Sequence, residues 1–131
     1  MSEARFPSGK VLAFTALVEA ATGLALMIDP GIVVKLLVGA EVSGSGTLLG
    51  RCFGMTLFAL GLACWPRCRS SADGSPALRA MFFYNAAIAL YLAYLGALGH
   101  LFGVLLWPAV ALHGAVALLL VWTGRAEAAV R

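Results

Sequence analysis

Long apolar stretches alternate with polar or glycine-rich segments along the chain. A helix that crosses the hydrocarbon core of a bilayer needs about 20 mainly apolar residues. Four stretches reach this length, and they run from about Lys10 to Ile28, from about Thr47 to Trp65, from about Leu78 to Leu98 and from about Leu101 to Thr123. The pattern therefore predicts an all-α integral membrane protein, in which residues 1–131 form a single domain, an up-down bundle of four transmembrane helices.

A shorter apolar run, PGIVVKLLVGA, lies between the first two predicted spans and is too short to cross a membrane. Pro30 can begin a helix, because the N–H that proline lacks is not needed in the first turn. Four apolar residues then share one face of that helix: Ile32, Val33, Leu36 and Leu37. We therefore expect a short interfacial helix in the first outer loop, followed by a flexible stretch, GAEVSGSG.

Pro108 falls inside the fourth predicted span. A proline in a helix interior removes a hydrogen bond and clashes with the carbonyl group four residues earlier, so we expect a kink that frees the carbonyl of Val104. Such a kink beside Trp107 can open a pocket. Tyr84 and Tyr91 lie seven residues apart on one face of the third span, where they either pack against neighbouring helices or line such a cavity.

The composition supports a membrane location, because 62% of the residues are hydrophobic, only 11% are charged and the mean hydropathy is +0.95. A soluble chain carries about 25% charged residues, and a small domain buries the smallest share of its surface. Lipid must therefore cover the apolar surface. The net charge of +3 does not indicate nucleic acid, because the basic residues lie at span ends rather than in a cluster.

Lysine and arginine residues that flank the spans fall mostly on one side of the predicted bundle. Seven of them share that side: Arg5, Lys10, Arg67, Arg69, Arg79, Arg125 and Arg131. The opposite side carries only Lys35. Because cytoplasmic segments of membrane proteins are enriched in lysine and arginine, the bias predicts that both termini are cytoplasmic.

Three ionisable side chains fall inside the predicted spans, where such groups are costly enough to be functional candidates. Glu19 and His113 lie near the middle of the first and fourth spans, and Arg51 lies about 6 Å inside the second. The amide of Asn85 lies in the inner half of the third span, and Thr15 shares a helix face with Glu19. We predict an intramembrane polar cluster of Glu19, Arg51, Asn85 and His113.

The role of Glu19 has three interpretations. Gly50 and Gly54 let the second span approach the first closely, and buried charges must be paired, so the structural interpretation is a buried ion pair between Glu19 and Arg51. Alternatively, Glu19 and His113 exchange a proton or bind an ion. A contact between Glu19 and a lipid or ligand headgroup is the third interpretation.

The sequence predicts no metal site, no cofactor and no known catalytic motif. His100 and His113 lie 13 residues apart on one predicted helix, which separates them by about 20 Å, too far for one metal ion. Pro66 lies between Cys64 and Cys68, and the two cysteines lack the C-x-x-C spacing. Because nucleotide-binding, metalloprotease and hydrolase motifs are also missing, the sequence favours a role without catalysis but does not decide whether the protein is an enzyme.

Three stretches together resemble a known group of sequences: LLGRCFGMTLFALGLACW, FYNAAIALYLAYLGALG and LLWPAVALHGAVALLL. They are similar to an uncharacterised family of small four-helix membrane proteins of proteobacteria. The motif-like positions are Pro30, Gly50, Arg51, Tyr84, Asn85, Trp107, Pro108 and His113. The resemblance covers most of the chain and implies the fold and a bacterial inner (cytoplasmic) membrane, but it brings no assigned activity.

Three hypotheses about function follow. The first is a structural or accessory subunit, or an interaction protein, held together by Glu19–Arg51 and Asn85–His113 contacts. The second is a small proton- or ion-linked transporter, in which Glu19 and His113 titrate. The third is a lipid-binding or lipid-modifying protein with a pocket near Pro108. In each case we expect the lipid bilayer as surroundings and a homo-oligomer or larger membrane complex, since four short helices enclose little volume.

Overall fold

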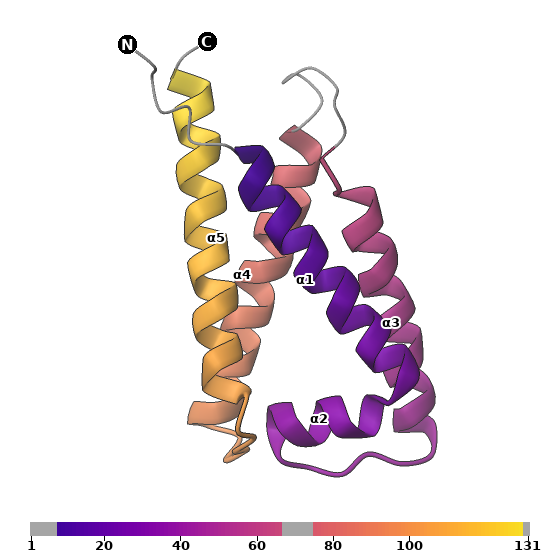
Figure 1. Ribbon diagram of the computed structural model, residues 1–131. Helices are drawn as coiled ribbons and strands as arrows, with labels where there is room; N and C mark the ends of the chain where they lie inside the picture. Colours follow the sequence, from indigo (N-terminus) through magenta and orange to yellow (C-terminus); the bar gives the residue numbers. More distant parts are fainter. Residues whose placement is uncertain (1–7, 67–74, 130–131) are drawn as a thin grey trace.

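The computed structural model describes residues 8–66 and 75–129, which form helices and connecting loops and contain no strand (Figure 1). The five helices of this part are α1 Ser8–Ile28, α2 Pro30–Val38, α3 Ser45–Ala63, α4 Ser75–Ala97 and α5 Leu106–Ala129. Four of them, α1, α3, α4 and α5, are long and apolar enough to cross a membrane. The prediction of an all-helical chain with four helices of membrane-spanning length is therefore confirmed.

Some residues that the sequence analysis used lie outside the described part of the chain. They are Arg5, Arg67, Cys68, Arg69 and Arg131. The charge bias between the two sides of the bundle therefore rests partly on residues whose positions the structure does not describe, and the expectation that Cys64 and Cys68 hold no metal stays a prediction.

The long helices form two antiparallel pairs, α1 with α3 and α4 with α5 (Figure 1). α1 leans across the bundle and also contacts α4 and α5. Because successive long helices run in opposite directions, α1 begins and α5 ends at the same end of the bundle. α2 lies crosswise at the opposite end, where it contacts α1, α3 and α5.

Glycine allows the close approach of α1 and α3. A Cβ atom added to Gly54 would lie 2.6 Å from the carbonyl oxygen of Gly23, and one added to Gly61 would lie 2.6 Å from the carbonyl oxygen of Ala16. Neither position has room for a larger side chain. Because small residues let helices pack closely within a bilayer, the predicted close packing of the first two spans is confirmed at Gly54, whereas Gly50 faces Pro30 of α2.

α2 begins and ends with recognisable capping residues. The Asp29 side chain accepts a hydrogen bond of 3.1 Å from the backbone N–H of Ile32, and Pro30 stands at the first helical position, where its fixed φ favours the helix. Gly39 ends the helix with a φ of 74°, a left-handed conformation that glycine adopts readily. These local signals place a separate short helix directly after α1.

The connection between α4 and α5 packs on the end of α2. The backbone N–H of Leu105 donates a hydrogen bond of 2.9 Å to the carbonyl oxygen of Leu36. Gly103 approaches Leu37 so closely that an added Cβ would overlap the Leu37 backbone. This contact holds the segment before Leu106 in a non-helical conformation.

The expected kink at Pro108 is therefore wrong. α5 begins at Leu106 rather than near Leu101, so Pro108 lies in the first turn, and Val104 lies before the helix. A proline in the first turn removes no helical hydrogen bond, because the N–H groups there have no partner within the helix.

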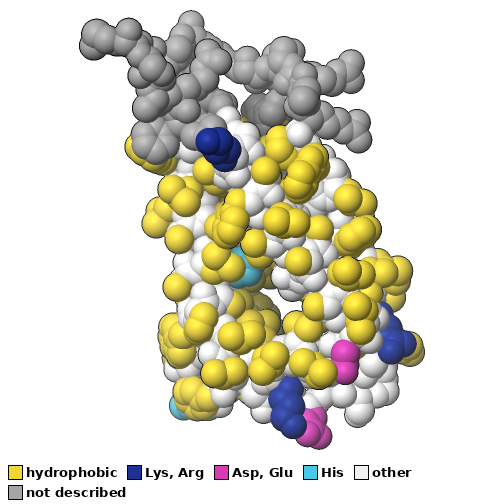
Figure 2. Space-filling model, viewed as in Figure 1, with side chains coloured by type: hydrophobic (Ala, Val, Ile, Leu, Met, Phe, Trp, Pro, Cys, Tyr) yellow, Lys and Arg dark blue, Asp and Glu magenta, His cyan; other side chains and the backbone are white. Residues whose placement is uncertain are grey.

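The buried apolar core lies toward the end of the bundle where α1 begins. Its buried members are Leu12, Ala16, Cys64, Met81, Val116 and Leu120. Elsewhere large apolar side chains face outward over much of the surface (Figure 2), among them Leu17, Phe83 and Leu118. Such an outward-facing apolar surface is typical of helices that contact lipid.

Candidate functional site

Polar side chains from three helices meet next to the apolar core. Thr15, Glu19 and Asn85 are each only 1% exposed, and the His113 side chain is 13% exposed. Together with the partly buried Tyr84, they form what we call the central polar cluster. α1 supplies Thr15 and Glu19, α4 supplies Tyr84 and Asn85, and α5 supplies His113.

The helix arrangement explains why these residues meet. Thr15 and Glu19 are four residues apart and therefore lie on one face of α1. α1 crosses the α4–α5 pair with this face inward. In Figure 2 the surface is hollowed between the two helix pairs, and a histidine side chain is visible at mid-height in this region.

Asn85 is the centre of a hydrogen-bonded chain that links α1, α4 and α5. Its amide nitrogen donates to the carbonyl oxygen of Met81 at 2.8 Å and to the hydroxyl oxygen of Thr15 at 3.2 Å. Its amide oxygen lies 2.7 Å from Nδ1 of His113. The Thr15 hydroxyl in turn lies 3.9 Å from the Met81 sulfur. The predicted contact between Asn85 and His113 is thus present.

Glu19 differs from its neighbours because neither carboxylate oxygen has a hydrogen-bond partner, although both are buried. The nearest basic group shown is Nδ1 of His113, which lies 3.8 Å from Oε1 of Glu19. The Tyr84 phenol is close enough to interact with the carboxyl group, but it does not form a hydrogen bond of good geometry with it. Buried polar groups almost always have partners, so an unpartnered one requires an explanation.

Tyr84 also packs against the histidine of the cluster. Its ring meets the His113 ring edge to face, with centroids 6.0 Å apart and an interplanar angle of 79°. Tyr84 therefore belongs to the central polar cluster. This contact agrees with the expectation that Tyr84 packs against a neighbouring helix, and the alternative that it lines a cavity stays a prediction.

The structure does not bring Arg51 to Glu19. Arg51 is exposed on α3, whereas Gly54 on the same helix is buried against α1, and Gly50 faces Pro30. Successive residues on a helix are turned by about 100° from each other. Arg51, the residue after Gly50, therefore points away from the contact between Gly50 and Pro30. The expected Glu19–Arg51 pair is therefore replaced by a contact between Glu19 and His113.

The other residues predicted to line a pocket lie on the outer surface. Tyr91 is 59% exposed and Trp107 is 53% exposed, and Pro108 is also exposed. Because these three residues are exposed, they do not enclose a cavity together with the partly buried Tyr84.

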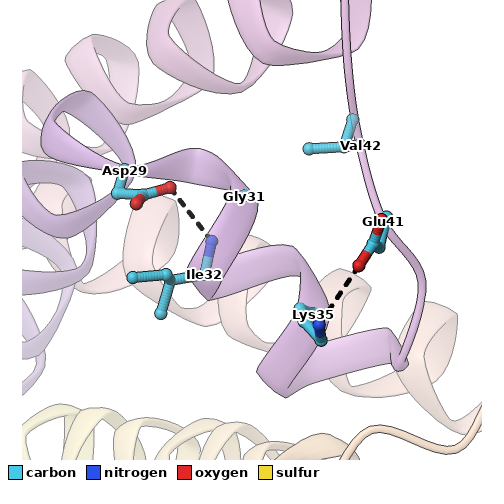
Figure 3. Close-up of a pocket in the computed structure, with 6 residues that line it drawn as sticks. All are labelled: Asp29, Gly31, Ile32, Lys35, Glu41 and Val42. Atoms are coloured by element: carbon cyan, nitrogen blue, oxygen red, sulfur yellow. Dashed lines mark hydrogen bonds and ion pairs between the residues drawn. The ribbon is translucent and has the colours of Figure 1, made fainter.

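A pocket of about 240 Å³ lies instead beside α2. It is lined by Asp29, Gly31, Ile32, Lys35, Glu41 and Val42 (Figure 3). Lys35 and Glu41 form an exposed ion pair with a distance of 3.1 Å across it. The polar groups of this pocket are thus used by the helix cap and by an exposed ion pair, which leaves the central polar cluster as the candidate site.

Sequence reasoning missed one member of the site and gave a signal for another. Met81 accepts hydrogen bonds through its backbone oxygen and sulfur, and no sequence pattern marks this role. Thr15 was marked by its position one turn before Glu19. Within residues 8–66 and 75–129, no group of three His, Cys, Asp or Glu side chains is arranged to hold a metal ion.

Comparisons of the chain with protein-family models, with curated proteins and with solved structures found no match. The fold and the site define a helical bundle with four helices of membrane-spanning length and a buried polar cluster between them. The resemblance to the proteobacterial family stays a prediction, and function must be argued from the cluster itself.

Proposed function

We propose that the protein is a small proton-linked transporter, in which Glu19 binds and releases the coupling proton. One observation carries the proposal: Glu19 is 1% exposed and both of its carboxylate oxygens lack a hydrogen-bond partner. A side chain that served only to hold helices together would be expected to use its hydrogen-bonding capacity. A carboxyl group kept free in the interior is suited to bind a cation, of which the proton is the smallest.

The surroundings of Glu19 support proton exchange. An ionised carboxylate in the interior costs several kcal/mol unless it is compensated, and the Lys and Arg side chains of the described residues are all exposed. His113 is the group within ion-pair distance, at 3.8 Å. A histidine can gain or lose a proton under physiological conditions, so its charge can follow that of Glu19.

The proposal includes the place and orientation of the protein. We place it in the bacterial inner membrane as a multi-pass protein with both termini in the cytoplasm, because Lys10, Arg79 and Arg125 lie near the end of the bundle where α1 begins. α2 is then the interfacial helix of the first outer loop. Because the two helix pairs enclose little volume, the proposal also includes assembly into a homo-oligomer or a larger membrane complex.

The test compares Glu19→Gln with Glu41→Gln in proteoliposomes. Currents are recorded on a solid-supported membrane under an imposed pH gradient, while a panel of small cationic, anionic and neutral solutes is applied. We expect at least one solute to give a pH-dependent current in the wild type and in Glu41→Gln, which alters an exposed carboxylate. Glu19→Gln should abolish this current while its helix content stays unchanged. Full retention of the current in Glu19→Gln would contradict the proposal.

A structural or accessory subunit is the second candidate. The hydrogen-bonded chain through Thr15, Asn85 and His113 favours it, because this chain ties three helices together. Native mass spectrometry of the protein purified in a mild detergent distinguishes the two candidates. A stoichiometric larger protein partner supports the accessory role, whereas a separate oligomer that carries a small solute supports transport.

A further inference from the structure

We propose that Asn85 holds neutral His113 in the tautomer with its hydrogen on Nδ1, so that His113, the ion-pair partner of Glu19, takes up a proton at Nε2. This inference rests on the proposed function, in which the charge of His113 follows that of Glu19, and it states which atom of His113 gains the proton. Asn85 is then a positioning residue: it acts through His113 rather than binding the proton itself.

The first step of the argument fixes the orientation of the Asn85 amide. The carbonyl oxygen of Met81 can only accept a hydrogen bond, and it lies 2.8 Å from the amide nitrogen. A flipped amide would place two acceptor oxygens against each other at that distance. The amide NH₂ group therefore faces Met81, and it also donates to the hydroxyl oxygen of Thr15 at 3.2 Å.

The second step determines which ring nitrogen of His113 carries the hydrogen. With the NH₂ group turned to Met81 and Thr15, the amide oxygen faces Nδ1 of His113 at 2.7 Å. An amide oxygen has no hydrogen to donate, so Nδ1 must donate. A neutral imidazole carries one N–H, and the hydrogen bond made by one nitrogen determines the state of the other. Nε2 therefore holds the free lone pair.

The third step concerns the other groups that face His113. α1 contributes Glu19, whose Oε1 lies 3.8 Å from Nδ1, and α4 contributes the Tyr84 ring. α2 also contacts α5, but its charged residue, Lys35, is exposed and paired with Glu41. A distance of 3.8 Å is too long for a hydrogen bond. The Nδ1–H group therefore donates its hydrogen bond to the amide oxygen of Asn85 rather than to Glu19, and Glu19 acts on the ring through its charge.

The proton balance is simple. A proton that binds Nε2 converts the neutral imidazole into an imidazolium ion without breaking the Nδ1–H hydrogen bond to Asn85. The positive charge then lies within ion-pair distance of the Glu19 carboxyl group. Release of the proton from Nε2 restores the neutral ring in the same orientation.

Nitrogen NMR of the ¹⁵N-histidine-labelled protein in lipid bilayers tests the inference directly, because the two tautomers give distinct nitrogen signals. The chain has two histidines, and a His100→Gln variant assigns the signals, since His100 is exposed in the α4–α5 connection. We expect the neutral His113 of the wild type to show the Nδ1–H pattern. A predominant Nε2–H pattern overturns the inference, and this wild-type measurement needs no variant of the cluster.

Two variants test the role of Asn85. Asn85→Leu removes the acceptor, so we expect the Nδ1–H to Nε2–H ratio to fall about fivefold or more, the ratio that corresponds to one ordinary hydrogen bond. Thr15→Val removes an acceptor from the amide but leaves Met81 to orient it, so the wild-type pattern should persist. An unchanged ratio in Asn85→Leu overturns the inference.

The NMR result is independent of any transport measurement. If His113 shows the Nδ1–H pattern and Glu19→Gln leaves solute-driven currents unchanged, the proposed function fails and the tautomer assignment stands. If the pattern is Nε2–H and Glu19→Gln abolishes the currents, the tautomer assignment fails and the proposed function stands.

Discussion

Thr15 shows how a single hydroxyl group contributes to this bundle. It is 1% exposed and accepts a hydrogen bond from Asn85 on a different helix. Thr15→Val keeps the shape of the side chain and removes the acceptor. We expect the free energy of unfolding to fall by about 1 kcal/mol, the size typical of hydrogen bonds between membrane helices. Equilibrium unfolding in mixed detergent micelles measures this change.

Thr56 offers a matched control for this substitution. It is exposed on α3, and its hydroxyl group donates to the carbonyl oxygen of Cys52 within the same helix at 3.1 Å. Thr56→Val should therefore change the free energy of unfolding by less than about 0.5 kcal/mol. Equal losses in Thr15→Val and Thr56→Val would show that the hydrogen bond between helices contributes nothing specific.

The sequence predicted part of the site at the level of residues. Depth along each helix can be read from residue number, so Glu19, Asn85 and His113 were expected near one another. The rotation of each helix about its axis depends on packing, and this rotation turns Arg51 outward while Gly54 faces α1. Met81 joins the cluster through backbone and sulfur atoms, for which side-chain type gives no signal.

At the level of elements, the α1–α3 interface depends on glycine. In Gly54→Ala the new Cβ would lie 2.6 Å from the carbonyl oxygen of Gly23, so the two helices must move apart. We expect a loss of about 1–3 kcal/mol in the free energy of unfolding, as for other overpacked interfaces. The same equilibrium unfolding assay measures the loss.

Gly114 on α5 is the control for this interface. A Cβ added there would meet nothing within 4 Å, so Gly114→Ala should leave stability unchanged or raise it by up to about 1 kcal/mol. A loss in Gly114→Ala as large as that in Gly54→Ala would mean that glycine is needed for a reason other than close helix packing.

The number of long helices could be predicted from the sequence because the length of an apolar run is a local property. The start of α5 could not, because residues 101–105 are as apolar as the helix that follows. Their conformation is decided by a tertiary contact, the hydrogen bond from Leu105 to Leu36. The expected kink at Pro108 failed for the same reason.

At the level of the whole molecule, the arrangement in Figure 1 places both described ends of the bundle on one side and α2 on the other. We expect a cysteine at Ser43, in the α2–α3 connection, to react with a membrane-impermeant maleimide in intact spheroplasts. A cysteine at Ala126, near the end of α5, should react only after the membrane is opened. Both variants are made in a background without the native cysteines. The opposite labelling pattern would reverse the proposed orientation.

The central claim is that Glu19 binds and releases a proton inside the bundle. Infrared difference spectroscopy of the protein in lipid bilayers tests it most directly, because a protonated carboxyl group has its own carbonyl stretching band. The proposed function predicts a Glu19 carbonyl band that changes with pH in the wild type and in Glu41→Gln and that is missing in Glu19→Gln. Identical spectra for the wild type and Glu19→Gln would contradict the claim.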